Sequence, residues 1–513
     1  MELNILMFMY KLCKNLLAQL VVYALLPFVW MVDNGVGVVP SICLYTVIHT
    51  LFWHNPIMRT PFHGLLLPYM CYAVISVLLY GVFDNWCHSL WFCLALPLYA
   101  LVSFVCVRLF CKYTRRVSRR FSYPLIVRSL LFVLVFVALK TISVHCVTSG
   151  YGDMEKEKQD VIERRDYLVD KFVNDSPKEV IDHLSASIGE QFQGEWALYS
   201  CSMFSAALTN ISRLYPEAAQ DNLGYVQRLI DTVMSPELRA YDTNRWGEDA
   251  LATLHGNKSH ISYISHLAWM ICGYKSAGGD DRYDAMLSAL CETMNRRILA
   301  TPSLNLPTYP GESIYVPDML VAIVALKQYS QLVDNRYSST VDKWLAKAQG
   351  EWLDRETGLL ASFLRADGAQ CPDAPVKGSY SALNCYYLTL IDPAFAQEQY
   401  TLLKKHLWRD GFIPGLCEYK EWTPVLGMDL DAGPLVFGLS PSGTAFLTGS
   451  ATYFNDSATR SHLLTTAETA GHTIAYANTR HYLLANLALV GEPIMLAMRT
   501  HVNKSSHSDS GGK

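Results

Sequence analysis

Five runs of apolar residues dominate the first 150 positions of the chain. They cover residues 15–33, 36–53, 64–83, 90–110 and 129–147. Each run is close to the ~20 residues that a helix needs to cross the ~30 Å hydrocarbon core of a bilayer. The pattern therefore predicts an N-terminal transmembrane anchor of about five helices. Because no A-x-A-like site follows the first run, it is interpreted as an anchor and not as a cleaved signal peptide.

Basic residues fall in alternate connections between these runs. Lys11 and Lys14 precede the first run, Arg59 lies between the second and third, and the segment 112–128 holds six Lys and Arg. The positive-inside rule then predicts a cytoplasmic N-terminus and an extracytoplasmic C-terminal domain, periplasmic in a bacterium. The basic segment also suits contact with anionic membrane lipid, although a purely topogenic role is the simpler interpretation.

After Gly150 the pattern changes to helical periodicity interrupted by Gly, Pro and Asn/Asp. The helices come in six pairs, and the second member of each pair is the more apolar. The pairs are 160–185 with 195–214, 221–235 with 260–275, 281–299 with 316–333, 338–353 with 378–391, 394–409 with 434–453, and 458–470 with 474–498. Six outer–inner pairs predict an all-α, (α/α)6 toroid, with a helical solenoid as the competing arrangement.

These patterns divide the chain into four parts. Residues 1–150 form the predicted anchor, 151–190 a charged stalk (Asp153–Asp170) with the first helix, 191–500 the barrel domain, and 501–513 a disordered tail.

The distribution of charge bears on the class of partner, and the spacing of the cysteines bears on a metal site. The first 150 residues carry 11 Lys and Arg against three acids, whereas the remainder carries 31 against 43, so an acidic domain follows a basic anchor. An acidic domain disfavours nucleic acid as a partner. The cysteines after Gly150 show no C-x-x-C or similar spacing, which gives no indication of a metal site.

The connections that lead into the predicted inner helices hold the candidate site residues, because these helix ends converge around one axis. Asp318 follows Pro317 at the start of an apolar helix, and Glu312 lies in the same connection. Asp318 is interpreted either as a helix-capping acid or as a partly buried proton-transfer group, and Glu312 either as a solvated residue or as its partner. Tyr309 and Tyr315 would line the pocket.

Two further connections add candidates. Asp429 and Asp431 lie two residues apart before another inner helix, so they serve either in turn and capping interactions or in binding a cation or a substrate hydroxyl. His266 lies within an apolar helical stretch, where it is either a hydrogen-bonded core residue or a proton shuttle. The chain has no G-x-S-x-G, P-loop, dinucleotide fingerprint or H-E-x-x-H motif, which disfavours a serine triad and nucleotide-driven work.

Five blocks of residues resemble the linalool dehydratase/isomerase family. They are Arg245–Met270 (RWGEDALATLHGNKSHISYISHLAWM), Tyr309–Leu326 (YPGESIYVPDMLVAIVAL), Trp352–Phe363 (WLDRETGLLASF), Leu390–Tyr400 (LIDPAFAQEQY) and Asp429–Leu447 (DLDAGPLVFGLSPSGTAFL). The resemblance implies an (α/α)6 barrel that adds or removes water from small alkenols without an organic cofactor. It places the family's catalytic His at His266, while Tyr309 and Asp318 stand where that family has two active-site cysteines.

The sequence therefore predicts a membrane-anchored lyase or isomerase with His266 and Asp318 as acid–base pair and no cofactor or metal. Tyr309, Glu312, Tyr315, Asp429 and Asp431 would bind a small-molecule or glycan substrate. Two alternatives stay open: a carbohydrate-active enzyme that uses paired carboxylates on envelope glycan, and a non-catalytic component of an envelope or export complex. The oligomeric state, including a homo-oligomer, also stays open.

Overall fold

The computed structural model describes residues 141–142, 144–184, 190–371, 374–411, 413–421, 426–429, 432–486 and 488–503. The chain divides into two compact units. One comprises residues 1–149 with 471–477, and the other comprises 150–470 with 478–513. The features below belong to the second unit unless their residue numbers place them in the first.

The predicted transmembrane anchor is corrected by the structure. Within the described residues, no helix is both long and apolar enough to cross a membrane. Four of the five predicted spans lie outside the described residues, and the fifth, 129–147, reaches them only from 141 onward. The described apolar helices are buried against one another in a ring of helices. The fold class is therefore a helical ring domain, and the expectation of a multi-pass membrane protein with an extracytoplasmic domain is withdrawn.

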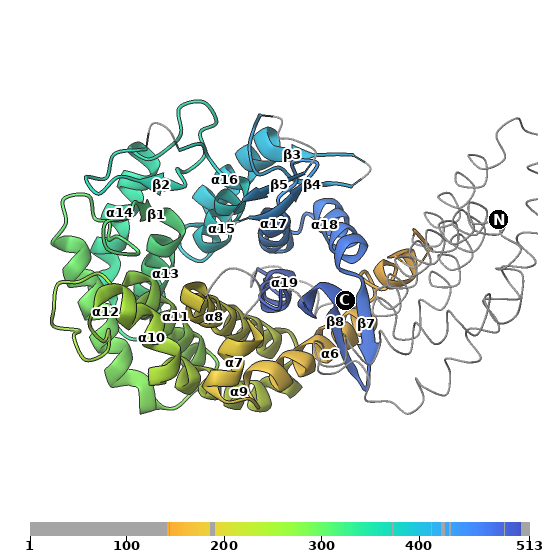
Figure 1. Cartoon of the computed structure of the whole chain (residues 1–513), viewed down its shortest axis with the longest axis horizontal. Helices are drawn as coiled ribbons and strands as arrows, with labels where there is room; N and C mark the ends of the chain where they lie inside the picture. The colour runs from red at the N-terminus through yellow and green to blue at the C-terminus, as the bar shows by residue number, and fades with distance from the viewer. Residues whose placement is uncertain are drawn as a thin grey trace, which may run out of the picture. The chain divides into compact units, whose positions relative to one another are not determined.

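Six inner helices form a closed ring. They are α8 (Glu190–Leu214), α11 (Ile261–Ser276), α13 (Val316–Leu332), α15 (Gly378–Thr389), α17 (Pro441–Tyr453) and α19 (Gly491–Arg499). Each packs against the next in chain order, and α19 packs against α8 to close the ring (Figure 1). Helices α11, α13 and α15 are buried around almost their whole circumference, which explains why their sequences are apolar on every face.

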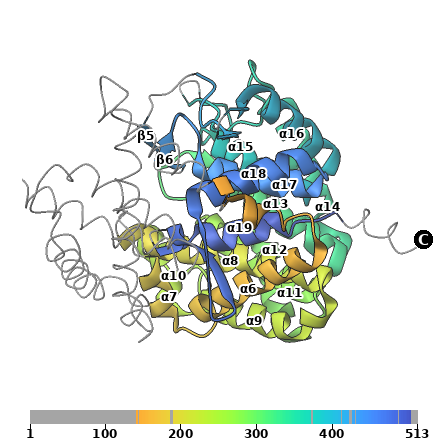
Figure 2. The same cartoon turned by 90° about the vertical axis from the view of Figure 1, so that its right-hand side faces the viewer.

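The outer helices return the chain between successive inner ones (Figure 2). They are α6 (Met154–Phe172), α7 (Pro177–His183), α9 (Ala219–Val233), α10 (Pro236–Trp246), α12 (Asp284–Leu299), α14 (Ser338–Gly350), α16 (Pro393–Leu407) and α18 (Ser457–Gly471). Several begin at clear capping residues: Ser235 before Pro236 in α10, and Asp392 before Pro393 in α16. The segment predicted as a stalk forms α6, which packs against α8 and α19.

Short antiparallel strands occupy the connections, where the sequence predicted almost none. Their bounds are β1 (Ile314–Tyr315), β2 (Phe363–Leu364), β3 (Trp408–Arg409), β4 (Gly415–Leu416), β5 (Leu426–Asp429), β6 (Gly433–Val436), β7 (Thr473–Tyr476) and β8 (Thr479–Tyr482). β1 pairs with β2, β3 with β4, and β5 with β6. The β1–β2 pair joins the entry of α13 to the connection that leads into α15, so these inner helices start at the same end of the ring.

Gly378 allows two connections to meet at the start of α15. Its N–H donates to the main-chain oxygen of Glu418 at 2.8 Å, and a Cβ at this position would lie 2.0 Å from the main-chain oxygen of Cys417. Gly378→Ala should therefore lower the free energy of unfolding by about 1–3 kcal/mol, as other overpacked sites do. Gly224→Ala is the matched control, because this exposed helical position has no atom near a new Cβ and should gain about 1 kcal/mol. Urea unfolding measures both changes, and equal effects would contradict the close approach.

Candidate functional site

Contacts between inner helices that are not neighbours in the ring identify the residues that face its axis. The Trp269 ring on α11 lies 5.6 Å from the Tyr387 ring on α15, and the Tyr199 ring on α8 lies 6.4 Å from the Phe446 ring on α17. The α13 helix separates the first pair of helices and α19 separates the second. Such contacts are made across the interior, so these four aromatic residues mark the ring axis.

His266 belongs to the same interior layer. It is 1% exposed, its Nδ1 lies 2.7 Å from the Ser202 hydroxyl, and the Tyr199 ring packs edge-on against it at 5.4 Å. Burial lowers the pKa of the imidazole to about 3, so it is neutral at neutral pH. In this state His266 can orient a substrate or a neighbouring hydroxyl by hydrogen bonding, but it carries no positive charge and is a weak base.

Asp318 lies in the first turn of α13, at the entry end of the ring. Its Oδ2 accepts a hydrogen bond from the Thr308 hydroxyl at 2.5 Å. Burial, and to a smaller extent the charge of Asp318, raises the pKa values of Tyr199 and Tyr387, which indicates that the carboxylate lies near both phenols. Tyr199 therefore contacts His266 and lies within electrostatic reach of Asp318, the two residues that the sequence predicted as an acid–base pair.

Glu195 is the acidic residue that the sequence analysis missed. It lies near the start of α8, and burial, with additions from the charges of Asp318 and Glu312, raises its pKa to about 7. Glu195, Tyr199 and Ser202 are spaced by four and three residues, so they share one face of α8. This polar stripe in a mostly buried inner helix was the available signal. A carboxyl group with a pKa near neutrality can both donate and accept a proton under physiological conditions.

Tyr309 and Arg245 adjoin Glu195. The Tyr309 hydroxyl lies beside the Glu195 carboxyl group, and the Arg245 guanidinium lies 4.3 Å above the Tyr309 ring. Arg245 Nη1 is 3.4 Å from Glu312 Oε1, so the partner of Glu312 here is an arginine, whereas the sequence analysis paired it with Asp318. The structure thus brings Tyr309, Glu312 and Asp318 into one cluster, and adds Glu195 and Arg245 to it.

Tyr315 and Asp429 lie in a second cluster, around Lys377. The Tyr315 ring contacts the rings of Phe363 at 5.1 Å and Tyr380 at 6.2 Å. The Lys377 ammonium lies 5.2 Å from the centre of the Tyr380 ring and 2.8 Å from Asp429 Oδ1. A hydrogen-bonded cation therefore neutralises the carboxylate that was predicted to hold a cation or a substrate hydroxyl.

The other half of that predicted carboxylate pair, Asp431, lies outside the described residues. Burial opposes ionisation of Asp429, but its hydrogen bonds with Lys377 and Tyr419 hold its pKa below the usual range.

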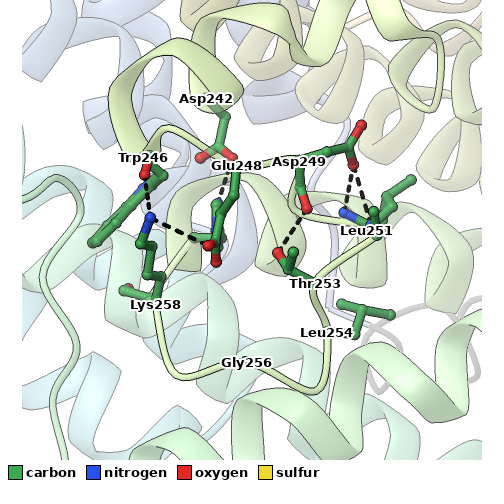
Figure 3. A network of polar contacts seen from close by, with 12 residues as sticks. Asp242, Trp246, Glu248, Asp249, Leu251, Thr253, Leu254, Gly256 and Lys258 are labelled. Carbon is green, nitrogen blue, oxygen red and sulfur yellow. Dashed lines mark hydrogen bonds and ion pairs between the residues drawn. The ribbon is translucent and has the colours of Figure 1, made fainter.

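A buried polar network fixes the connection between α10 and α11 (Figure 3). His260 Nδ1 lies 2.6 Å from Asp242 Oδ2, and both side chains are fully buried. Lys258 Nζ donates to the main-chain oxygen of Trp246 at 2.7 Å and pairs with Glu248 at 3.2 Å. His260 has a positive φ of 48°, a strained conformation for this residue type. These ion pairs and hydrogen bonds hold the start of α11 in place.

At the opposite end of the axis, the described residues enclose a small cavity of about 40 Å³. Its polar lining includes Ser202, Thr209, Asn210, Arg213 and His501. Space for one water centre takes about 10–15 Å³, so this cavity accommodates a few water molecules and no organic substrate. The carboxyl groups that could react with a substrate, those of Glu195 and Asp318, lie at the entry end.

The predicted disordered tail begins at His501, but this residue is buried. Its Nε2 lies 2.7 Å from the Thr389 hydroxyl. Residues 504–513 lie outside the described residues.

Neither a metal cluster nor a disulfide occurs among the described residues. No group of three or more His, Cys, Asp or Glu is arranged to hold a metal ion there, and the described cysteines are all free thiols. The chemistry available at the entry end is therefore that of carboxyl, phenol, imidazole and guanidinium groups, and the absence of a cofactor stays a prediction.

Comparison with known proteins identifies no family for this chain. No known protein family model matches the chain, and no curated protein is similar to it. The resemblance to the linalool dehydratase/isomerase family thus stays a prediction, and the side-chain geometry is the basis for the functional proposal.

Proposed function

We propose that this protein is a cofactor-independent acid–base enzyme of the lyase or isomerase type, which eliminates water from, or adds it to, a small hydroxylated substrate. The observation that carries the proposal is the position of Glu195, a carboxyl group with a pKa of about 7, beside Asp318 at the entry end of the ring. Water elimination needs one group to protonate the leaving hydroxyl and another to accept a proton from carbon. A neutral carboxylic acid can protonate the leaving hydroxyl, and a neighbouring carboxylate can accept the proton from carbon.

In the proposed elimination, the protonated Glu195 donates its proton to the substrate hydroxyl as the carbon–oxygen bond breaks, and water leaves. Asp318 accepts the proton from the adjacent carbon, whose electron pair forms the double bond. Addition of water follows the same steps in reverse, and addition at a different carbon isomerises the alcohol. His266, neutral and bonded to Ser202, orients the interior hydroxyls, so its role changes from the proton shuttle predicted from the sequence to a positioning residue.

Deuterium incorporation tests this proposal directly. The full chain is incubated in D₂O with linalool or geraniol, and carbon-bound deuterium in the recovered alcohols is measured by mass spectrometry. We expect Asp318→Asn to lower the incorporation rate about 10²–10⁴-fold, the usual contribution of one acid–base group. Asp334→Asn is the control, because Asp334 pairs with Arg336 just beyond the end of α13 that is opposite to Asp318, and it should keep the wild-type rate. No incorporation by the wild type, or an unchanged rate in Asp318→Asn, would contradict the proposal.

A second candidate function is favoured by the aromatic cluster around Lys377. Phe363 of that cluster also lines a groove of about 770 Å³, which has room for an extended polar ligand. Aromatic rings beside such a groove suit the apolar faces of sugars, and glycosidases combine a carboxylic acid with a carboxylate. Release of nitrophenol from nitrophenyl glycosides by the wild type, but not by Glu195→Gln, would favour glycoside hydrolysis over water elimination from alcohols.

A further inference from the structure

Asn384 lies on the axis-facing side of α15. Tyr380, Asn384 and Tyr387 are spaced by four and three residues, which places them in one stripe along the helix. Tyr387 contacts Trp269 across the ring, and Tyr380 contacts Tyr315 at the entry of α13. Asn384 is located between these two contacts, one helical turn further into the ring than Tyr380, and so lies beneath the entry-end carboxyl groups.

The side-chain amide of Asn384 is buried without a partner. The residue is 1% exposed, and neither its Nδ2 nor its Oδ1 has a hydrogen-bond partner within the described part of the chain. The hydroxyls of Tyr199 and Tyr387 lie beside one another and face the same axis. Most buried polar groups in proteins are hydrogen-bonded, because desolvation without a partner is unfavourable. A bound group on the axis would supply partners for both atoms of the Asn384 amide.

We infer that Asn384, with Tyr199 and Tyr387, binds a second hydroxyl group of the substrate, distinct from the hydroxyl that leaves. An amide offers one donor and one acceptor side by side, and an alcohol hydroxyl offers the complementary pair. A simple alkenol cannot supply this, because its single hydroxyl is engaged by Glu195 in the elimination. The inference rests on the proposed function and extends it: the substrate class is a diol or polyol.

Thermal unfolding without ligand distinguishes a binding residue from a structural one. Asn384→Leu replaces the unpaired amide by an apolar group of similar size, so the melting temperature should stay the same or rise by roughly 2–4 °C. Asn222→Leu is the matched control: Asn222 is equally buried, but its amide is bonded to Arg165, Ser212 and the main-chain oxygen of Leu208. It should melt well below the wild type. A comparable decrease in Asn384→Leu would show that its amide is satisfied within the folded protein and would overturn the inference.

Ligand-induced stabilisation of the full chain completes the test. Geraniol is compared with hydroxygeraniol, which carries one additional hydroxyl at its far end. The wild type should be stabilised more by hydroxygeraniol, and Asn384→Leu should respond equally to both alcohols. Equal stabilisation of the wild type by both alcohols, including none by either, or a preference that survives in Asn384→Leu, would overturn the inference. Deuterium incorporation from geraniol together with equal stabilisation would leave the proposed function standing and remove only the second-hydroxyl site.

Discussion

Glu195→Gln is expected to lower the rate of proton transfer about 10²–10⁴-fold while making the protein more stable above pH 7. The amide keeps the size and polarity of the carboxylic acid but cannot donate a proton, so one acid–base contribution is lost. The stability gain follows from the pKa of the buried carboxyl group, which is about 7 in the folded protein against 4.5 in an unperturbed glutamate. Turnover by mass spectrometry and melting temperature measure the two effects separately.

The pH dependence of this effect has a defined sign. Because the pKa of Glu195 is raised on folding, the folded state binds more protons than the unfolded chain between about pH 4.5 and 7. The protonated carboxyl group makes its full contribution to the free energy of unfolding below about pH 4.5. As the pH rises to about 7, the free energy of unfolding falls by about 3 kcal/mol. The advantage of Glu195→Gln over the wild type should therefore be small at pH 4.5 and largest at pH 8.

An exposed glutamate provides the control for this pH series. Glu398 lies on the surface of α16, and Glu398→Gln should melt at the wild-type temperature at both pH values. An equal advantage of Glu195→Gln at pH 4.5 and 8 would show that the effect comes from packing and not from ionisation. Loss of stability at pH 8 would show that the carboxylate is stabilised in the folded protein, and Glu195 would no longer be suited to the role of general acid.

Long helices were the part of the helical ring that the sequence predicted most closely. The predicted segment 316–333 corresponds to α13, Val316–Leu332, and 281–299 to α12, Asp284–Leu299. α13 was recognised from its continuous apolar run and α12 from the periodicity of its apolar positions, and each extends over four or more turns. Strands of two to four residues show no such periodicity, so the pairs that join the inner-helix entries were missed. The anchor prediction came from the length of the apolar runs and the charges between them, and no described helix is long and apolar enough to cross a membrane.

Site residues could be predicted from the sequence only where they lie at the start of an inner helix. Asp318 follows Pro317 at such an entry and lies in the cluster as expected. Glu195 lies in the second turn of α8, and the polar stripe that it shares with Tyr199 and Ser202 does not by itself separate an axis-facing acid from a solvated one. Arg245 was missed because α10 was not predicted, although Ser235 before Pro236 gives an N-terminal signal. Which polar residues meet across the axis depends on the closure of the ring, and local sequence does not encode it.

A buried ion cluster ties α6 to the last inner helix, which makes α6 part of the ring domain. Asp160, 2% exposed, accepts hydrogen bonds from Arg164 at 3.1 Å and Arg480 at 3.2 Å, and also pairs with Arg499. Burial opposes ionisation of Asp160, but the three guanidinium groups hold its pKa far below the usual range. Glu492 compensates part of the positive charge through Arg164 at 3.5 Å, although burial raises its own pKa to about 7.

Asp160→Asn should therefore lower the free energy of unfolding by about 3–5 kcal/mol, because it leaves buried arginines without their main counter-charge. The variant keeps the shape of the side chain, so the loss reports charge and not packing, and calorimetry measures it as a large decrease in melting temperature. Glu217→Gln is the control: its 2.5 Å pair with Lys158 is solvent-exposed and should contribute little to stability. If the free energy of unfolding falls by the same small amount in both variants, the charged cluster is hydrated in solution and is not buried. If the predicted difference is found, residues 154–172 belong to the ring domain, and removing them as a stalk would expose the buried charges of α19 and unfold the site.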